Sequence, residues 1–230
     1  KKEESVFELT KKEQAYLEGL TEKTLTIGIA EESFWSVWNK TSYGTAVPTI
    51  EILKNVFGLN VEVVTGGWSA LKKELFSENI DFVFGMSTVE TKEKTTSSNT
   101  KLYYSEPIFE NPCLLVVPQK SQTAAQQIEG LQIGVVEASP VPETIADYLK
   151  QKNEFINYRN TAELLDAVEK NELDAAIITE SMLYALYGRT KLKAERCFGQ
   201  FENSGGLCTA KEEFEGLIKL YNRCFLEKIK

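Results

Sequence analysis

The stretch TIGIAEES (residues 26–33) returns in the second half of the chain as QIGVVEAS (residues 132–139). Each copy starts with a polar residue, continues with Ile-Gly and two small apolar residues, and then has an acid and, in last place, a serine. Both patterns predict a buried strand that ends in polar residues. The repetition indicates that the protein builds the same strand ending twice.

A second pair of similar segments lies further along the chain. ALKKELFSENIDFVFGMST (70–88) aligns without a gap on ELLDAVEKNELDAAIITES (163–181). In both, an amphipathic helix pattern leads to a charged turn, an Ile-Asp or Leu-Asp pair and an apolar run. Strand–turn–helix units look alike in many α/β proteins, but two pairs in the same order favour two similar half-domains. Their offsets of about 100 residues are far longer than the period of a solenoid repeat.

The alternation of strand and helix patterns predicts an α/β fold with two lobes, each a doubly wound sheet with helices on both faces. A lead-in helix is expected within residues 1–21. The first lobe is expected to comprise residues 22–112 and to be completed by the terminal helix in residues 205–230. Residues 113–204 are expected to form the second lobe. Both lobes fall within the usual size of a domain.

Composition narrows the classes of function. Hydrophobic residues make up 42% of the 230 residues, and the net charge is -8. The negative charge argues against nucleic acid or an anionic membrane surface as a partner. No apolar run reaches the roughly 20 residues of a membrane span, and the polar start is not typical of a signal peptide. We therefore expect a processed protein or an excised domain, with membrane attachment only through segments outside this chain.

The chain contains no histidine and four cysteines. The missing histidine excludes His-based triads and removes the commonest metal ligand, so no metal site or cofactor is expected. The cysteines are too far apart for a zinc knuckle or a CxxC motif. Cys197 and Cys208 flank the turn-rich segment FGQFENSGGL (198–207), so they form either a disulfide across a hairpin or two buried free thiols. The sequence leaves both alternatives open, together with the states of Cys113 and Cys224.

Four predicted strand ends carry polar residues: GIAEES, GVVEAS, GMST (85–88) and ITES (178–181). In open parallel α/β sheets, ligands bind beyond the carboxyl ends of the strands, near the first turns of the following helices. If the two lobes face each other, all four ends meet at one cleft. The repeated strand ending is then what a two-lobed binding clamp requires.

These segments resemble the type 2 periplasmic solute-binding proteins, that is, the family 3 Venus flytrap fold. The chain is similar in particular to flytrap sensor domains of bacterial membrane-bound signalling proteins. The resemblance rests on GVVEASP, LFSENIDFVFG and YYSEPIF (103–109), and on the lead-in helix pattern before the first strand. The resemblance covers nearly the whole chain. No single motif is specific to the family, but the motifs occur in the family's order and at its spacing.

The resemblance implies a set of ligand-binding residues and no catalytic ones. In the first lobe, it places an acid and an aromatic residue on the wall of the cleft, an aromatic residue stacked on the ligand, and a ligand-binding strand end. In the second lobe, it places a hydroxyl group that grips a carboxylate and an acid that receives an amino group. The implied positions are Glu31, Phe34, Trp68, Met86, Ser87 and Thr88 in the first lobe, and Glu137, Ser139 and Glu180 in the second.

The chain departs from the family pattern at two places. The TxxR motif, whose arginine clamps a carboxylate, is replaced by TKEK (91–94), where Lys94 or Lys92 is a substitute without the planar fork. Pro140 removes a backbone donor from the turn after QIGVVEAS. With three acids and no arginine at the expected positions, the ligand is expected to be a neutral or amine-bearing solute, such as an amino acid or a related compound.

Three functions fit this resemblance. The leading hypothesis is an extracytoplasmic sensor domain that closes on a small polar ligand and signals to a downstream module. The near alternative is the solute-binding component of an ABC transporter, which delivers its ligand to a permease. An enzyme of the cyclohexadienyl dehydratase type shares the fold and would use Glu137 or Glu180 as its acid or base.

Overall fold

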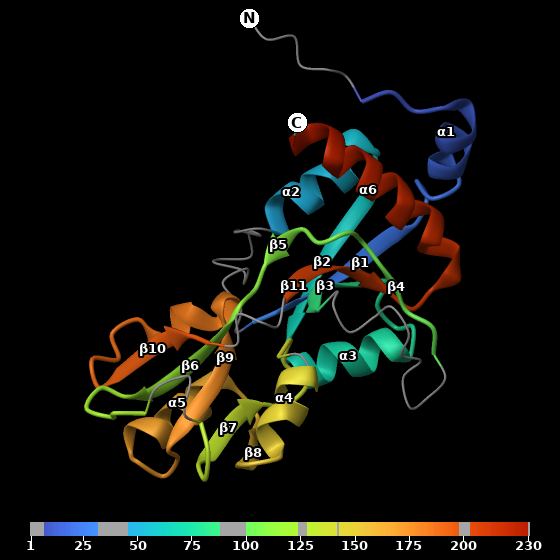
Figure 1. Ribbon diagram of the computed structural model, residues 1–230. Helices are drawn as coiled ribbons and strands as arrows, with labels where there is room; N and C mark the ends of the chain where they lie inside the picture. The colour runs from blue at the N-terminus through green and yellow to red at the C-terminus, as the bar shows by residue number, and fades with distance from the viewer. Residues whose placement is uncertain are drawn as a thin grey trace, which may run out of the picture.

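The computed structural model describes residues 7–31, 46–87, 100–123, 128–141, 143–197 and 203–229, which form two α/β lobes (Figure 1). The first sheet contains β1 (Thr24–Ala30), β2 (Asn60–Gly66), β3 (Phe82–Ser87), β4 (Tyr103–Tyr104), β5 (Phe109–Glu110) and β11 (Ser204–Thr209). The second sheet contains β6 (Cys113–Pro118), β7 (Gln132–Val136), β8 (Glu154–Tyr158), β9 (Ala175–Thr179) and β10 (Leu192–Arg196).

The two sheets share one topology. The first has the order β2-β1-β3-β11-β4, with β5 also paired to β11, and the second has the order β8-β7-β9-β6-β10. In each, three parallel strands are followed by an antiparallel one, β11 or β6. The antiparallel strand of each sheet follows a crossing of the chain from the other lobe. The repeated segments of the sequence therefore occupy equivalent strands, with β1 matching β7 and β3 matching β9.

Helices cover both faces of each sheet. The helices are α1 (Lys11–Glu18), α2 (Ala46–Glu51) with the π-helical turn η1 (Ile52–Val56), α3 (Trp68–Phe76), α4 (Glu143–Lys150), α5 (Thr161–Glu169), the 3-10 helices η3 (Glu180–Leu186) and η4 (Glu212–Phe214), and α6 (Glu215–Ile229). In the first lobe, α1, α2 and α6 lie on one face of the sheet and α3 on the other (Figure 1). In the second lobe, α4 and α5 lie on opposite faces. The prediction of doubly wound sheets with helices on both faces is confirmed.

The repeated Ile-Gly pair has a packing reason. A Cβ atom on Gly28 would lie 2.9 Å from Ile80 Cδ1 and 3.0 Å from a Leu71 methyl carbon. At the equivalent Gly134, a Cβ atom would overlap Leu164 Cδ1 and lie 2.6 Å from Leu173 Cδ1. The glycine in each lobe therefore lets one helix and the start of the next strand pack directly on the backbone of the central strand.

The repeated Asp residues fix the start of the same strands. Asp81 Oδ2 accepts a hydrogen bond of 2.7 Å from the backbone N–H of Thr26. In the second lobe, Asp174 Oδ2 accepts one of 2.8 Å from the N–H of Gln132. In the first lobe, Lys211 adds an ion pair of 2.6 Å to Asp81. Each carboxylate accepts from a backbone N–H at the start of the central strand, where the strand pairing begins. The role of both aspartates is therefore structural.

The ends of several elements have local causes. Helix α1 begins with a capping box between Thr10 and Glu13. Helix α2 begins at Ala46 and continues as a π-helical turn, and the chain after β9 forms a 3-10 helix. Strand β10, LKAER, is exposed on an edge of the sheet apart from Leu192, so it lacks the apolar run by which buried strands are recognised.

The four cysteines are buried free thiols, which settles the alternative left open by the sequence. Cys197 packs in the core of the second lobe, whereas Cys208 packs behind the first sheet with Trp68. Between these two cysteines the chain passes from the second lobe to the first, and residues 198–202 lie outside the described residues. The two thiols therefore belong to different cores and do not face each other.

Candidate functional site

The ends of β1 and β7 place Glu31 and Glu137 at equivalent positions. The backbone N–H of Glu31 donates to Gly66 O at 3.1 Å, and that of Glu137 donates to Tyr158 O at 2.9 Å. Each hydrogen bond extends the pairing of the central strand with its parallel neighbour by one residue. Both side chains are exposed beyond the strand end. Two carboxylates thus stand at the edge where ligands bind in sheets of this kind.

A buried network centred on Asn203 connects the strand ends of the two lobes. Ser87 Oγ, at the end of β3, donates to Asn203 Oδ1 at 2.9 Å. The amide of Asn203 donates to Asn111 O at 2.8 Å and to Pro140 O at 3.0 Å. The Asn111 side chain in turn accepts from the N–H of Ser181 at 2.9 Å. The network therefore joins β3 of the first lobe, both crossing segments, and, in the second lobe, the loop after β7 and the start of η3.

This network gives Ser87 a structural partner, while its expected role in ligand binding stays a prediction. Its hydroxyl is buried and bonded to Asn203, so in this conformation it holds the crossing segments together. The neighbouring Ser139 is also buried, and its N–H closes a turn by donating to Val136 O at 3.2 Å. Ala138, the residue before Ser139, has a left-handed backbone with φ of 57°, which turns the chain sharply after β7.

Trp68 and Met86 lie in the core behind the first sheet. Trp68, the first residue of α3, is only 2% exposed and packs with Met86, Leu71 and Cys208. Ala138 of the second lobe packs against the same cluster. Trp68 Nε1 is buried and has no hydrogen-bond partner among the described residues. The indole therefore lies in a core to which both lobes contribute, and stacking on a ligand would require it to turn out of this core.

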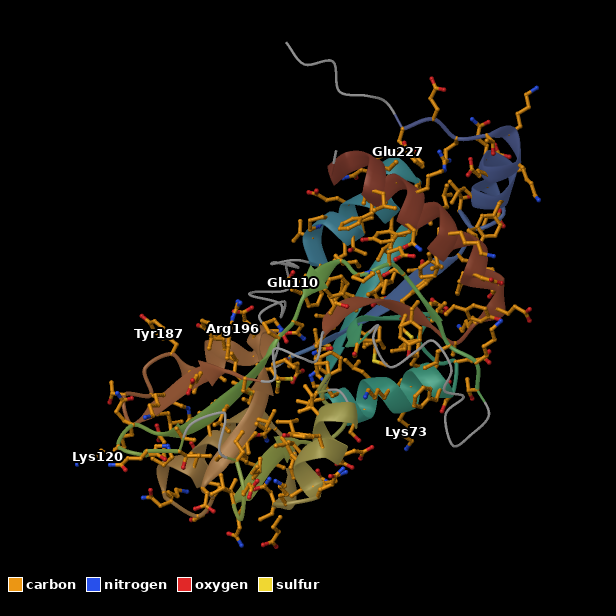
Figure 2. The ribbon with its side chains drawn as sticks, in the orientation of Figure 1. Lys73, Glu110, Lys120, Tyr187, Arg196 and Glu227 are labelled. Carbon is orange, nitrogen blue, oxygen red and sulfur yellow. The ribbon has the colours of Figure 1, made fainter. Side chains whose placement is uncertain are left out.

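Glu180 begins η3 directly after β9, and its carboxylate is paired. Glu180 Oε1 lies 2.6 Å from Arg196 Nη2 at the end of β10. The carboxylate raises the pKa of the Arg196 guanidinium, and Glu110 adds to the effect. Figure 2 shows Arg196 and Glu110 on the same side of the molecule. Arg196 thus lies beside Glu180, the acid expected to bind the amino group of the ligand.

Three of the expected residues, Phe34, Thr88 and Lys94, lie outside the described residues, as does Lys92. Of the others, the structure brings Trp68 and Met86 together in one cluster, and it connects Ser87 to the loop of Ser139 through Asn203. Glu31 and Glu137 remain exposed at strand ends. In the part of the chain that the structure describes, no three potential ligands from His, Cys, Asp and Glu are grouped for a metal ion.

Sequence reasoning missed Asn111, Asn203 and Arg196. A signal for the two asparagines was present, because the tripeptide FEN occurs at 109–111 and again at 201–203. The asparagines that end the two copies lie on the two crossing segments, where the N–H of Asn111 donates to Asn203 O at 2.9 Å. Arg196 gave no such signal, since it lies on a strand that has no apolar pattern.

No protein-family model matches the chain, and no curated protein matches it in sequence. Solved structures do match. The periplasmic VFT2 domain of Bordetella pertussis BvgS has a TM-score of 0.74 and 16% identity, covering 97% of this chain and 94% of that one. A second match is the amino acid ABC transporter substrate-binding protein AbpA from Streptococcus pneumoniae, bound to L-arginine. It has a TM-score of 0.72 and 15% identity, covering 90% of this chain and 89% of that one.

The substrate-binding protein of another amino acid ABC transporter has a TM-score of 0.71 and 15% identity, covering 89% of this chain and 92% of that one. At these identities the comparison concerns architecture. The chain has the two-lobed fold of the type II periplasmic binding proteins. Among the described residues, no helix has the length and apolar character needed to cross a membrane.

Proposed function

We propose that the chain is an extracytoplasmic binding domain that closes on a small polar ligand, an amino acid or a related amine-bearing solute. The observation that carries the proposal is the convergence of strand ends from both sheets on the buried Asn203 network. Closure of such a clamp needs no chemistry, only a higher affinity of the ligand for the closed state. In this proposal, residues 22–112 and 205–230 form the first lobe and residues 113–204 the second, with 1–21 as the lead-in.

The ligand would lie beyond the strand ends, against Glu31 and Glu137 and beside Glu180. Phe34, Thr88 and Lys94 belong to the same proposed site by their positions in the sequence. The pairing of Glu180 with Arg196 refines the ligand class. A zwitterion can satisfy both groups, with its amine on the carboxylate and its carboxylate on the guanidinium. An α-amino acid therefore fits a site that contains both Glu180 and Arg196 better than it would fit a site with acids alone.

The role we favour is that of a sensor domain, tethered to the membrane in a longer protein and coupled to a downstream signalling module. The likeness to the BvgS domain supports this role, and the likeness to transporter proteins supports the alternative, delivery of a solute to a permease. An enzyme of the cyclohexadienyl dehydratase type is a third hypothesis. A turnover assay with a cyclohexadienyl carboxylate separates that enzyme from a binding domain.

A thermal-shift screen against amino acids, polyamines, small peptides and carboxylates tests the proposal. A ligand at 100 times its Kd should stabilise the fold by about 2.7 kcal/mol. The Glu180→Gln variant should weaken the hit, whereas Glu195→Gln, an exposed acid on the same strand as Arg196, should bind like the parent protein. If none of these compounds shifts the melting temperature, the hypothesis of a small polar ligand is wrong.

A further inference from the structure

Strand β10 forms one edge of the second sheet, at the outer border of the second lobe (Figure 1). It pairs with β6 on one side, and among the described residues no strand pairs with its other side. At the two ends of this ladder, the N–H of Gln119 donates to Lys191 O at 2.6 Å and that of Cys197 donates to Cys113 O at 3.1 Å. The odd-numbered residues of the strand therefore direct their peptide groups to β6. The residues whose peptide groups point away from the sheet are Leu192, Ala194 and Arg196.

The outward peptide groups of an edge strand are a template for another strand. The N–H of Leu192 is already engaged, because it donates to Arg189 O at 3.3 Å in the turn before β10. A second, antiparallel copy of β10, centred on Ala194, would use the groups that remain. The two Ala194 residues would bond to each other, and the N–H of each Arg196 would donate to the C=O of Leu192 in the other copy.

The side chains of β10 match a second copy of the strand in this one register. With the two Ala194 residues opposite each other, Lys193 of each copy lies opposite Glu195 of the other. These are non-hydrogen-bonded positions, where facing Cα atoms are only about 4.5 Å apart. Opposite charges at such positions stabilise a strand pair, and like charges destabilise it. Registers centred one residue away, on Lys193 or on Glu195, would place like charges opposite each other. The strand is therefore complementary in charge to itself.

Charged residues on an edge strand commonly prevent pairing with other chains. In β10 both charges are exposed: Lys193 Nζ donates to Ser121 O at 2.6 Å, and Glu195 forms no hydrogen bond or ion pair with the described residues. An ammonium group has three donors, so Lys193 can retain Ser121 and still reach a carboxylate. These charges exclude most partner strands and select one with the reverse order of charges, which a second copy provides.

An exposed aromatic surface lies on η3, the element that precedes β10. Met182 of η3 packs in one core with Leu192, and residues 188–191 join η3 to the strand. The rings of Tyr184 and Tyr187 are stacked with their centres 6.2 Å apart, and the two residues are 60% and 87% exposed. Figure 2 shows Tyr187 extending from the outer side of the second lobe. Grouped exposed apolar side chains mark interaction surfaces. A two-fold axis normal to the sheet would place this surface of both copies on the same face of the extended sheet.

We propose that β10 is a self-association surface, to which a second copy of this chain adds its own β10 in antiparallel orientation. The second lobes of the two copies then share one continuous sheet around a two-fold axis at Ala194. Lys193 of each copy forms an ion pair with Glu195 of the other. Because the same surface is used by both copies, the interface closes on itself and gives a dimer.

The charged pairs of this interface lie apart from the proposed ligand site. In the ladder with β6, Lys193 lies opposite Val117, whereas Arg196 lies opposite Leu114. Val117 and Leu114 belong to cores on opposite faces of the sheet. Glu195 shares the face of Lys193, because side chains alternate along a strand. Substitutions of these two charges should therefore leave the affinity for an amino acid unchanged.

Analytical ultracentrifugation over a range of protein concentrations tests the proposal. In 0.15 M salt the repulsion between two chains of net charge -8 is screened beyond about 8 Å, so the parent should show a monomer–dimer equilibrium. Lys193→Glu and Glu195→Lys each place like charges opposite each other on both sides of the axis, and each should weaken dimerisation about tenfold or more. Lys73→Glu makes the same change of charge as Lys193→Glu at an exposed position of α3 in the first lobe (Figure 2). It should dimerise like the parent.

Mixing the two variants gives the sharpest comparison. The Lys193→Glu copy carries acids at both positions and the Glu195→Lys copy carries lysines at both, so every facing pair in a mixed dimer is of opposite charge. The mixture should therefore dimerise at least as well as the parent, although neither variant does so alone. The double variant Lys193→Glu/Glu195→Lys reverses each pair and should also restore the dimer.

Three outcomes would overturn the proposal. The first is a parent chain that stays monomeric up to millimolar concentration, and the second is a dimer that neither single variant weakens. The third is a loss in both single variants without recovery in their mixture. These measurements use no ligand, so they are independent of the proposed function. A chain that dimerises through β10 but binds no amino acid would contradict the proposed function alone, and a monomer that binds one would contradict the dimer alone.

Discussion

Ser87 and Asn203 form a buried hydrogen bond of 2.9 Å although 116 residues separate them in the sequence. Ser87 ends a strand of the first lobe, and Asn203 lies on the second crossing segment. The same asparagine bonds to the first crossing segment and to the loop after β7. One side chain therefore connects a strand end of the first lobe with both crossing segments and with a loop of the second lobe.

Replacing Asn203 by alanine should lower the free energy of unfolding by about 2 to 4 kcal/mol. The change leaves the Ser87 hydroxyl and two backbone carbonyls buried without a partner, and unpaired buried polar groups are more costly than lost hydrogen bonds. Urea unfolding of the variant measures the loss. Asn79→Ala is the control, since the Asn79 amide bonds to the Glu74 carboxylate at an exposed site, and it should cost well under 1 kcal/mol. Equal losses would show that Asn203 has no special role.

Gly134→Ala should destabilise the second lobe by about 1 to 3 kcal/mol, because the added methyl group overlaps Leu164 and Leu173 in a packed core. Gly66→Ala is the matched control: its methyl group would meet Leu71 at 3.6 Å, an ordinary contact. Thermal unfolding of the two variants gives the comparison. A Gly134→Ala protein as stable as the parent would contradict the packing reason given for the repeated glycine.

Trp68→Phe should destabilise the fold much less than Trp68→Ala. The indole N–H has no partner among the described residues, so its removal releases a buried donor and offsets part of the lost volume. Alanine removes the whole ring from a core position and should cost about 3 to 5 kcal/mol. Chemical denaturation distinguishes the two. If phenylalanine is as damaging as alanine, the N–H has a partner in solution, and a ligand-facing role for Trp68 becomes the better hypothesis.

The fold could be predicted because its signals are local. Three local features recur in both lobes: apolar runs of strand length, a glycine on whose backbone a leucine side chain packs, and an aspartate just before a strand. Each copy therefore supports the interpretation of the other. The acids at the strand ends were predictable for the same reason, since Glu31 and Glu137 occupy equivalent positions after equivalent strands. In each sheet, the antiparallel strand follows a crossing of the chain from the other lobe.

The interior of the site could not be predicted in the same way, because it depends on contacts across the lobes. Ser87 looks like a ligand-binding hydroxyl until Asn203 is placed beside it, and Glu180 looks like an unpaired acid until β10 brings Arg196 to it. Trp68 has the same sequence context whether its ring faces a ligand or a core. Sequence periodicity carries no information about such pairings, which arise from tertiary packing.

Arg196→Met should change which ligands the proposed site prefers. The change releases the Glu180 carboxylate from its cationic partner, so compounds that carry only an amine should bind more tightly. Compounds that depend on a carboxylate should bind more weakly, by about tenfold or more if the guanidinium contacts them. Calorimetry with putrescine and with the best amino acid hit measures both effects. A uniform change for both compounds would place Arg196 outside the site, and Lys193→Met, which removes an exposed cation of the same strand, is the charge control.

The buried thiols should be unreactive in the folded protein. Burial raises the pKa of Cys208 to about 12 from an ordinary 9.0, and raises that of Cys197 as well, so almost no thiolate exists at pH 8. An aromatic disulfide reagent should therefore label no cysteine in the native protein and all four in guanidinium chloride.

The same shift predicts a loss of stability in alkali. The Cys208 thiol stays protonated in the fold but ionises in the unfolded chain, so its contribution is fully present below pH 9 and is lost as the pH rises towards 12. The slope of the free energy of unfolding in this range, measured by denaturation, should be smaller in Cys208→Ala. Rapid labelling of the native protein at pH 8, or an unchanged slope in Cys208→Ala, would contradict the burial of this thiol.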